Sequence, residues 1–212
     1  MNSNLENIKH AVVAGQHADI EQMVQKAIDE GDKLNEVINE ALIGAMDIVG
    51  EKFAANEIYV PEMLVSAMTM KKGLELIKPL LTDEEAEYRG TIMMGTVKGD
   101  LHDIGKNLVL MMLEGAGFEA VDLGVDLSVE KVVEEVEKRK PQVLGLSALL
   151  TTTMPEMRKV IENLEERGLR DTVKVMVGGA PVDAAFAEQI GADGYGKDAA
   201  EAVQLAKRFA GA

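Results

Sequence analysis

The spacing of apolar positions changes once along the chain, near residue 80. Up to that point apolar residues recur every three or four positions, which is typical of amphipathic helices. These helical stripes cover residues 5–13, 18–27, 34–49 and 63–80. Pro61 suits the first turn of the last helix, because its missing N–H would be unpaired there in any case. Four helices with short connections predict a small four-helix bundle.

From Gly90 onward, short apolar runs alternate with longer amphipathic ones. The short runs predict strands at 91–97, 118–123, 143–147, 173–177 and 194–195. The longer runs predict helices at 103–115, 129–139, 154–167, 182–190 and 199–210. This alternation is typical of a parallel sheet with helices on both faces. Five such units predict a flavodoxin-like (Rossmann-like), doubly wound α/β fold with five parallel strands.

A polar and charged segment, residues 82–89, separates the two patterns. Segments of this kind commonly connect domains, because few contacts cross them. We therefore expect a helical domain at residues 1–88 and an α/β domain at residues 89–212.

The composition narrows the classes of function. The chain has 212 residues, no cysteine and a formal net charge of -15. The absence of cysteine excludes disulfides and thiolate metal sites, and it agrees with a reducing, cytoplasmic location. The negative charge opposes binding to nucleic acid or to anionic membranes. We see no secretory signal at the start, and no apolar run reaches the roughly 20 residues of a membrane-spanning helix. We expect a cytoplasmic protein that binds neither nucleic acid nor membranes.

The loop after the first predicted strand carries the most suggestive chemistry. It contains Asp100 and His102, and the chain has only three histidines. Two residues that lie two positions apart in an extended segment project to the same side. Asp100 can then accept a hydrogen bond from one imidazole nitrogen and leave the other nitrogen free to bind a metal. No further ligand lies at zinc-like spacing, so a metal bound by His102 would need its other ligands from a macrocycle. The alternative is that His102 is a hydrogen-bonded loop histidine that binds no metal.

Three motifs follow one another at the carboxyl ends of predicted strands. They are Asp-x-His-x-x-Gly at residues 100–105, Ser-x-Leu at 147–149 and Gly-Gly at 178–179. With these motifs and their spacing, the chain resembles the cobalamin-binding modules of methionine synthase and of the small corrinoid proteins in methyltransferase systems. The resemblance includes the helical part and thus covers nearly the whole chain.

The resemblance implies a role for each motif. Cobalamin would be bound base-off, with His102 as the lower axial ligand of cobalt and the displaced nucleotide tail in a slot beside the sheet. Asp100 would tune His102. Thr153, which stands where methionine synthase has a serine, would complete a proton relay. The other cofactor-binding residues that we expect are Asp103, Ile104, Gly105, Ser147, Leu149, Thr151, Gly178, Gly179 and Tyr195.

Plainer interpretations exist for some of these residues. The threonines at 151–153 equally suit helix capping. Strand-end and turn chemistry would account for the serine and the glycines.

The helical domain is similar to the cap of the family, which covers the upper face of cobalt. Tyr59 aligns with an aromatic residue of that cap, so we expect Tyr59 and Met63 near the upper face; the alternative places both in the bundle core.

The resemblance implies a methyl carrier, not expected to be a complete catalyst alone. Its cobalamin would alternate between cob(I)alamin and methylcobalamin. A substrate-specific methyltransferase would present the donor, which could be methanol, a methylamine, a betaine or a methoxylated aromatic. A second methyltransferase would present the acceptor, either tetrahydrofolate or a thiol such as coenzyme M. A corrinoid-reductive activase is a further expected partner.

Three alternatives use the same α/β module. One is the cobalamin-binding subunit of an adenosylcobalamin-dependent mutase, which requires a large partner barrel. Another is a cobalamin-responsive regulator, which adds a DNA-binding domain that we do not expect here. The third is a flavodoxin-like signalling domain without a cofactor. The helical cap, the acidic charge and the three motifs in register favour the methyl carrier.

Overall fold

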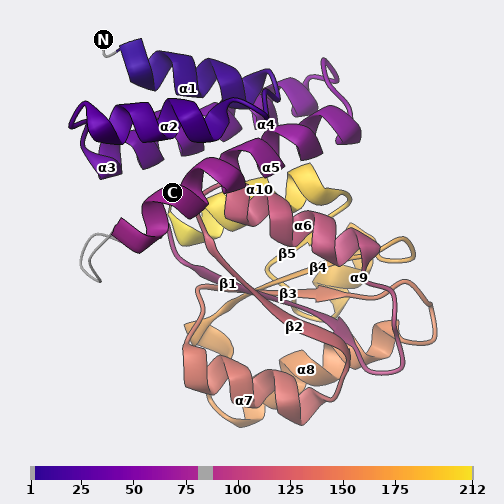
Figure 1. Cartoon of the computed structure of the whole chain (residues 1–212). Helices are drawn as coiled ribbons and strands as arrows, with labels where there is room; N and C mark the ends of the chain where they lie inside the picture. Colours follow the sequence, from indigo (N-terminus) through magenta and orange to yellow (C-terminus); the bar gives the residue numbers. More distant parts are fainter. Residues whose placement is uncertain (1–2, 81–87, 212) are drawn as a thin grey trace. The chain divides into compact units, whose positions relative to one another are not determined.

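The computed structural model describes residues 3–80 and 88–211 (Figure 1). Contacts between Cα atoms divide the chain into two compact units. One unit comprises Met1–Tyr88 and Glu114–Gly117, and the other comprises Arg89–Leu113 and Phe118–Ala212. Most of the polar segment that we predict as the domain boundary, residues 82–87, lies outside the described residues.

The first unit is built from helices. They are α1 (Ser3–Val13), α2 (Ile20–Asp29), α3 (Leu34–Glu36), the π-helical η1 (Val37–Ile43), α4 (Gly44–Ala54), α5 (Val60–Ile77) and the 3₁₀ turn η2 (Lys78–Leu80). Because α3, η1 and α4 are continuous, they form one rod, and the unit has the predicted bundle of four rods. Helix α1 packs against α2, α4 and α5. Pro61 lies in the first turn of α5, as predicted.

The second unit contains a five-stranded sheet. Its strands are β1 (Thr91–Val97), β2 (Glu119–Leu127), β3 (Val143–Ser147), β4 (Lys174–Gly178) and β5 (Gly194–Gly196). All pairs are parallel, in the order β2-β1-β3-β4-β5. The chain moves outward from β1 to β2 and then returns to β3, so the direction reverses between β1 and β3. Ligands of open α/β sheets bind at the carboxyl edge beside such a reversal.

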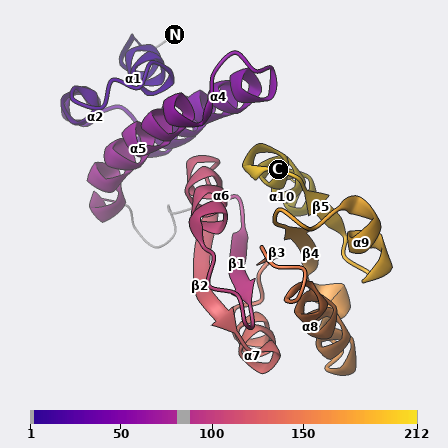
Figure 2. The ribbon, with the colours of Figure 1, turned by 90° about the vertical axis from the view of Figure 1, so that its right-hand side faces the viewer.

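Helices cover both faces of the sheet, as the alternating pattern predicts. They are α6 (Ile104–Gly115), α7 (Val129–Arg139), α8 (Met154–Glu166), the 3₁₀ turn η3 (Arg170–Thr172), α9 (Ala184–Gln189) and α10 (Ala199–Ala210). Helices α7 and α8 lie on one face, and α6 and α10 lie on the other (Figure 2). Right-handed crossovers require this division, because the chain changes direction after β2. A buried apolar cluster joins the sheet to α7, α8 and α9.

An ion-pair group fixes the start of β4. The Asp193 carboxylate lies 2.7 Å from a guanidinium nitrogen of Arg170 and 2.9 Å from Lys174 Nζ. It also accepts the N–H of Val175 at 2.8 Å. Burial alone would raise the pKa of Asp193, but these partners lower it below its usual range. The carboxylate therefore joins β4 to the segment before β5.

Several predicted elements have different bounds in the structure, and two of these differences have a clear physical reason. Strand β2 continues to Leu127 instead of ending at residue 123, because it stays paired with β1 through two register shifts. The helix predicted at 182–190 is shorter, since α9 begins only after Asp183, whose carboxylate accepts the N–H of Phe186. No helix within residues 3–80 and 88–211 combines the length and apolar character needed to cross a membrane.

Candidate functional site

The three sequence motifs meet at the carboxyl edge of the sheet. In neighbouring strands Thr96 is level with Ser147, and Ser147 is level with Gly178. The first motif starts just beyond β1, while the other two begin at the ends of β3 and β4. The parallel sheet therefore brings side by side three segments that lie far apart in the sequence, next to the reversal between β1 and β3.

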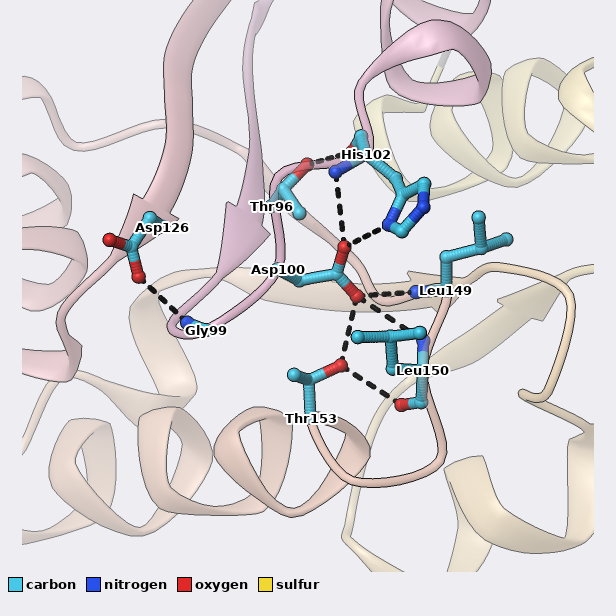
Figure 3. A network of polar contacts seen from close by, with 8 residues as sticks. All are labelled: Thr96, Gly99, Asp100, His102, Asp126, Leu149, Leu150 and Thr153. Carbon is cyan, nitrogen blue, oxygen red and sulfur yellow. Dashed lines mark hydrogen bonds and ion pairs between the residues drawn. The ribbon is translucent and has the colours of Figure 1, made fainter.

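Asp100 is fully buried, and both of its carboxylate oxygens are occupied (Figure 3). Oδ1 accepts the backbone N–H of His102 at 3.1 Å and lies 2.7 Å from His102 Nδ1. Oδ2 accepts the N–H groups of Leu149 and Leu150 at 2.7 and 3.3 Å. It also accepts the hydroxyl of Thr153 at 2.9 Å. The residues after β3 thus supply three donors to a carboxylate on the loop after β1.

These contacts decide the charge of Asp100 and the tautomer of His102. Burial alone would raise the pKa of Asp100, but the hydrogen bonds from Leu149, His102 and Thr153 together hold it well below its usual range. An ionised carboxylate can only accept hydrogen bonds. His102 Nδ1 must therefore carry a proton, which leaves Nε2 of the neutral imidazole with a free lone pair. The side chain of His102 is 53% exposed.

The backbone of His102 has its own support. The buried hydroxyl of Thr96 donates to the carbonyl of His102 at 2.9 Å. This bond joins the end of the loop to β1, one of the two strands at the reversal. His102 is thus held at its backbone by Thr96 and at its ring by Asp100.

Large apolar side chains are exposed in the two loops that form this site. Leu101 and Ile104 are 71% and 86% exposed, and Leu149 and Leu150 are also exposed. Exposed apolar residues that gather in one place commonly mark a surface that a ligand or partner covers. Here Leu101 and Ile104 flank His102 between β1 and the start of α6, and Leu149 and Leu150 lie in the loop after β3.

A cavity of about 290 Å³ lies on the sheet face that α6 and α10 cover. Small residues leave this space open between the two helices and the strand ends. Its lining includes Gly105, Ser147, Gly178, Gly179, Gly196 and Ala202. The cavity is wide enough for part of a small molecule, and its wall starts three residues after His102.

The glycines around the cavity differ in what they do for the fold. A Cβ on Gly178 would come within 2.9 Å of the carbonyl of Gly196, and Gly179 has a φ of 125° and adjoins the carbonyl of Ala148. The fold itself therefore requires glycine at these two positions, because a side chain would collide with the neighbouring backbone. A Cβ on Gly105 would meet nothing within 4 Å, and its φ does not require glycine. The open space beside Gly105 is therefore available to a ligand.

Comparisons with known proteins agree with this geometry. Two family models, each described as a B12 binding domain, match residues 90–204 and 5–78. The chain belongs to the family of B12-binding corrinoid proteins. It is 38% identical to a corrinoid protein from Desulfitobacterium hafniense, over 99% of this chain and 98% of the relative. It is 42% identical to dimethylamine corrinoid protein 1 from Methanosarcina acetivorans, over 97% of this chain and 96% of the relative.

A solved structure supports the same conclusion. The methanol:cobalamin methyltransferase complex from Methanosarcina barkeri matches with a TM-score of 0.89 and 32% identity, over 99% of this chain and 80% of that chain. The family, the fold and the cobalamin cofactor that the sequence predicts are thereby confirmed.

The residues of this corrinoid protein fit a cobalamin. A corrin ring supplies most of the ligands of its cobalt, so the protein needs one nitrogen donor, and the Nε2 lone pair of His102 can provide it. The exposed apolar side chains offer contacts to a large flat group. The cavity beside Gly105 has room that no side chain of residues 3–80 and 88–211 occupies. Within the described residues, no three His, Asp or Glu side chains gather as a metal site.

The structure brings several predicted site residues together. Asp100, His102, Leu149 and Thr153 form the polar network, while Gly105 and the residues at the ends of β3 and β4 line the cavity. The capping interpretation of Thr153 is wrong, because its hydroxyl bonds to Asp100 and does not cap α8. Thr151 is exposed.

Other predicted residues lie elsewhere. Tyr195 does not line the cavity, and its ring packs against the apolar cluster on the opposite face of the sheet. Asp103 accepts the side-chain amide of Asn107 at 3.1 Å, at the start of α6. Tyr59 is 66% exposed, so its placement in the bundle core is wrong, whereas Met63 is buried as the core interpretation requires.

The sequence analysis missed residues that support the site through backbone groups, either their own or those of the loop after β1. Leu150 contributes an N–H group, and no residue type signals that contribution. Thr96 and Asp126 hold the loop from β1 and β2. The only signal of Thr96 in the sequence is its place near the carboxyl end of an apolar strand, and Asp126 lies beyond the end of the strand predicted at 118–123.

Proposed function

We propose that this protein is a methyl carrier that holds cobalamin base-off, with His102 as the lower axial ligand. Bound cobalamin supplies a cobalt centre that can take up a methyl group and give it away. The observation that carries the proposal is the set of contacts around the Asp100 carboxylate. Four donors besides the imidazole keep Asp100 ionised, and the ionised carboxylate in turn requires the proton on Nδ1 and leaves Nε2 free.

The residues around His102 would each do one task. Asp100 orients the ring and directs the Nε2 lone pair away from itself, because a carboxylate partner of a ligating imidazole fixes its tautomer and orientation. Thr153 is a positioning residue that stabilises the charge of Asp100. Its hydroxyl is the only non-backbone donor to Oδ2 among the described contacts, so it is also the best candidate for proton relay.

The cavity would accept the nucleotide tail of the cofactor. Gly105 provides backbone that a ligand can approach closely, and Ser147, Gly178 and Gly179 form the opposite wall. The apolar side chains of Leu149 and Ile104 would contact the corrin ring. The exclusion of water from that contact would stabilise the complex in proportion to the apolar area covered.

The two parts of the chain would have different duties. We propose that residues 1–88 form a cap domain and residues 89–212 form the cobalamin-binding domain, with Tyr59 of the cap available to the upper face of the cofactor.

The partners would be a donor methyltransferase, an acceptor methyltransferase and a reductive activase. The relatives named for dimethylamine and methanol favour a small methylated amine or alcohol as the donor. The acceptor would be a folate or a thiol, and the lack of cysteine favours a cytoplasmic setting.

The direct test is the His102→Ala variant, loaded with cobalamin and reduced to the cobalt(II) state. In the wild type, electron paramagnetic resonance should show splitting from one axial nitrogen, and ¹⁵N-labelled histidine should change that splitting. His102→Ala should lose the histidine signal, while His17→Ala, a variant in the helical unit, should keep it. Persistence of the labelled-histidine splitting in His102→Ala would exclude His102 as the ligand.

A further inference from the structure

Asp126 has a backbone conformation that residues other than glycine rarely adopt. Its φ is 52°, in the left-handed region, although its side chain is exposed and contributes nothing to the core. Non-glycine residues in this region are uncommon and cost free energy unless their surroundings impose the conformation. An exposed residue held in this way calls for a local cause.

The cause lies in the pairing of β2 with β1. Gly95 is level with Gly124, but Val97 is level with Leu127, so β2 uses one residue more than β1 over this stretch. An extra residue of this kind is a β-bulge, which bends a strand and turns a side chain in a new direction, often beside a functional site. Asp126 lies within this bulge.

Both polar groups that Asp126 presents at the bulge bind the loop that carries His102. Its carboxylate Oδ1 accepts the N–H of Gly99 at 2.7 Å (Figure 3). Its backbone N–H donates to the carbonyl of Asp100 at 3.0 Å. Gly99 itself has a φ of 80°. Two consecutive residues of the loop are thus fixed from β2, immediately before the carboxylate that orients His102.

We propose that Asp126 is a positioning residue, which sets the place of Asp100 and through it the orientation of the His102 ring. Bonds from the loop between β3 and α8 hold the carboxylate of Asp100, whereas Asp126 holds the backbone of Asp100 from β2. The left-handed conformation of Asp126 is unfavourable, but it directs both the carboxylate and the backbone N–H at the loop. This inference rests on the proposed function in one respect, the role of His102 as a ligand.

Three substitutions separate the contributions of Asp126. Asp126→Asn keeps an acceptor and tolerates the left-handed region. Asp126→Gly relieves the backbone but removes the acceptor, and Asp126→Ala removes the acceptor and retains the strain. Lys140, with a φ of 50° at the end of α7, gives a matched control, because Lys140→Gly relieves the same strain far from the loop in sequence.

The first measurement uses the protein without cofactor. Amide hydrogen exchange of Gly99, followed by NMR, should quicken about tenfold in Asp126→Gly and Asp126→Ala, which corresponds to about 1.4 kcal/mol. Asp126→Asn and Lys140→Gly should exchange at about the wild-type rate. Unchanged exchange of Gly99 in Asp126→Gly would overturn the inference.

The second measurement uses the cobalamin-loaded protein. The fraction of cobalt(II) centres with histidine-nitrogen splitting should fall in Asp126→Gly and be restored in Asp126→Asn. If the wild type shows the splitting and Asp126→Gly shows the same fraction, then Asp126 does not position His102 and the inference is wrong. If the wild type itself shows no histidine splitting, the proposed function fails first, and faster exchange of Gly99 would then report only a loop contact.

Discussion

Replacement of Asp100 by asparagine should move the proton on the His102 ring. Asparagine has nearly the same shape as aspartate, but it offers one oxygen acceptor and one NH₂ donor in place of two acceptors. Two orientations of the amide are possible. If the NH₂ replaces Oδ2, it faces the N–H groups of Leu149 and Leu150. If it replaces Oδ1, it faces only one backbone N–H, that of His102, together with the ring nitrogen Nδ1.

The count of fixed donors decides between these orientations. Each buried N–H that loses its acceptor costs about 1–3 kcal/mol, so the orientation that sacrifices one such group is favoured over the one that sacrifices two. In that orientation the NH₂ donates to Nδ1, which must then be unprotonated. The proton moves to Nε2, and the free lone pair that wild-type His102 presents is lost. The unpaired N–H and the loss of the charged acceptor should together lower the free energy of unfolding by about 2–4 kcal/mol.

The tautomer can be read from the protein without cofactor. Long-range ¹H–¹⁵N correlation of the imidazole nitrogens should show Nδ1 protonated in the wild type and Nε2 protonated in Asp100→Asn. The spectra should be recorded at about pH 8, where an ordinary histidine is neutral. His10 and His17, in the helical unit, serve as internal controls and should be unchanged. An unprotonated Nε2 in Asp100→Asn, or a loss of stability below about 1 kcal/mol, would refute this account of the donors.

Three further outcomes follow from the structure. Thr153→Val should lower the free energy of unfolding by about 1–2 kcal/mol, because Asp100 loses a donor, whereas Thr153→Ser should unfold in urea like the wild type. Gly105→Ala should stabilise the cofactor-free protein by up to about 1 kcal/mol, since the new methyl, in the first turn of α6, meets no atom of the described residues within 4 Å. Isothermal titration should nevertheless show cobalamin binding at least about tenfold weaker. Asp193→Asn should cost about 1–3 kcal/mol at neutral pH. The partners of Asp193 lower its pKa, so the difference in free energy of unfolding between wild type and variant should persist above pH 3.8, the ordinary pKa, and shrink as the pH falls below it. A difference that does not change with pH in urea unfolding would contradict the ion-pair role of Asp193.

The sequence predicted most of the fold because the apolar pattern repeats over whole elements. The helix at 129–139 and the strand at 143–147 have the predicted bounds. Strand β2 was underpredicted, because Gly124 interrupts its apolar run and resembles a turn. Only the pairing with β1 keeps that segment extended, and a single strand does not reveal its partner.

The site was predictable to the extent that it is local. Asp100 and His102 are two residues apart, so their contact follows from the geometry of an extended chain. The face of the sheet on which Tyr195 lies was also predictable from the local sequence. Side chains alternate between the two faces of a strand, and the tyrosine lies between two glycines, so it faces away from the side that Gly196 lines.

What the sequence lacked was the environment that makes Asp100 a carboxylate. A fully buried carboxyl group stays ionised only if donors replace the water that it loses. Three of those donors come from residues 149, 150 and 153, about fifty positions away, and two of them are backbone N–H groups that any residue would supply. They reach Asp100 only after β1 and β3 pair and α8 begins at the correct residue. The free lone pair of His102 is therefore a property of the assembled sheet edge, and the Asp-x-His motif alone does not provide it. A variant that disturbs this edge should change the tautomer of His102 even when both motif residues are intact.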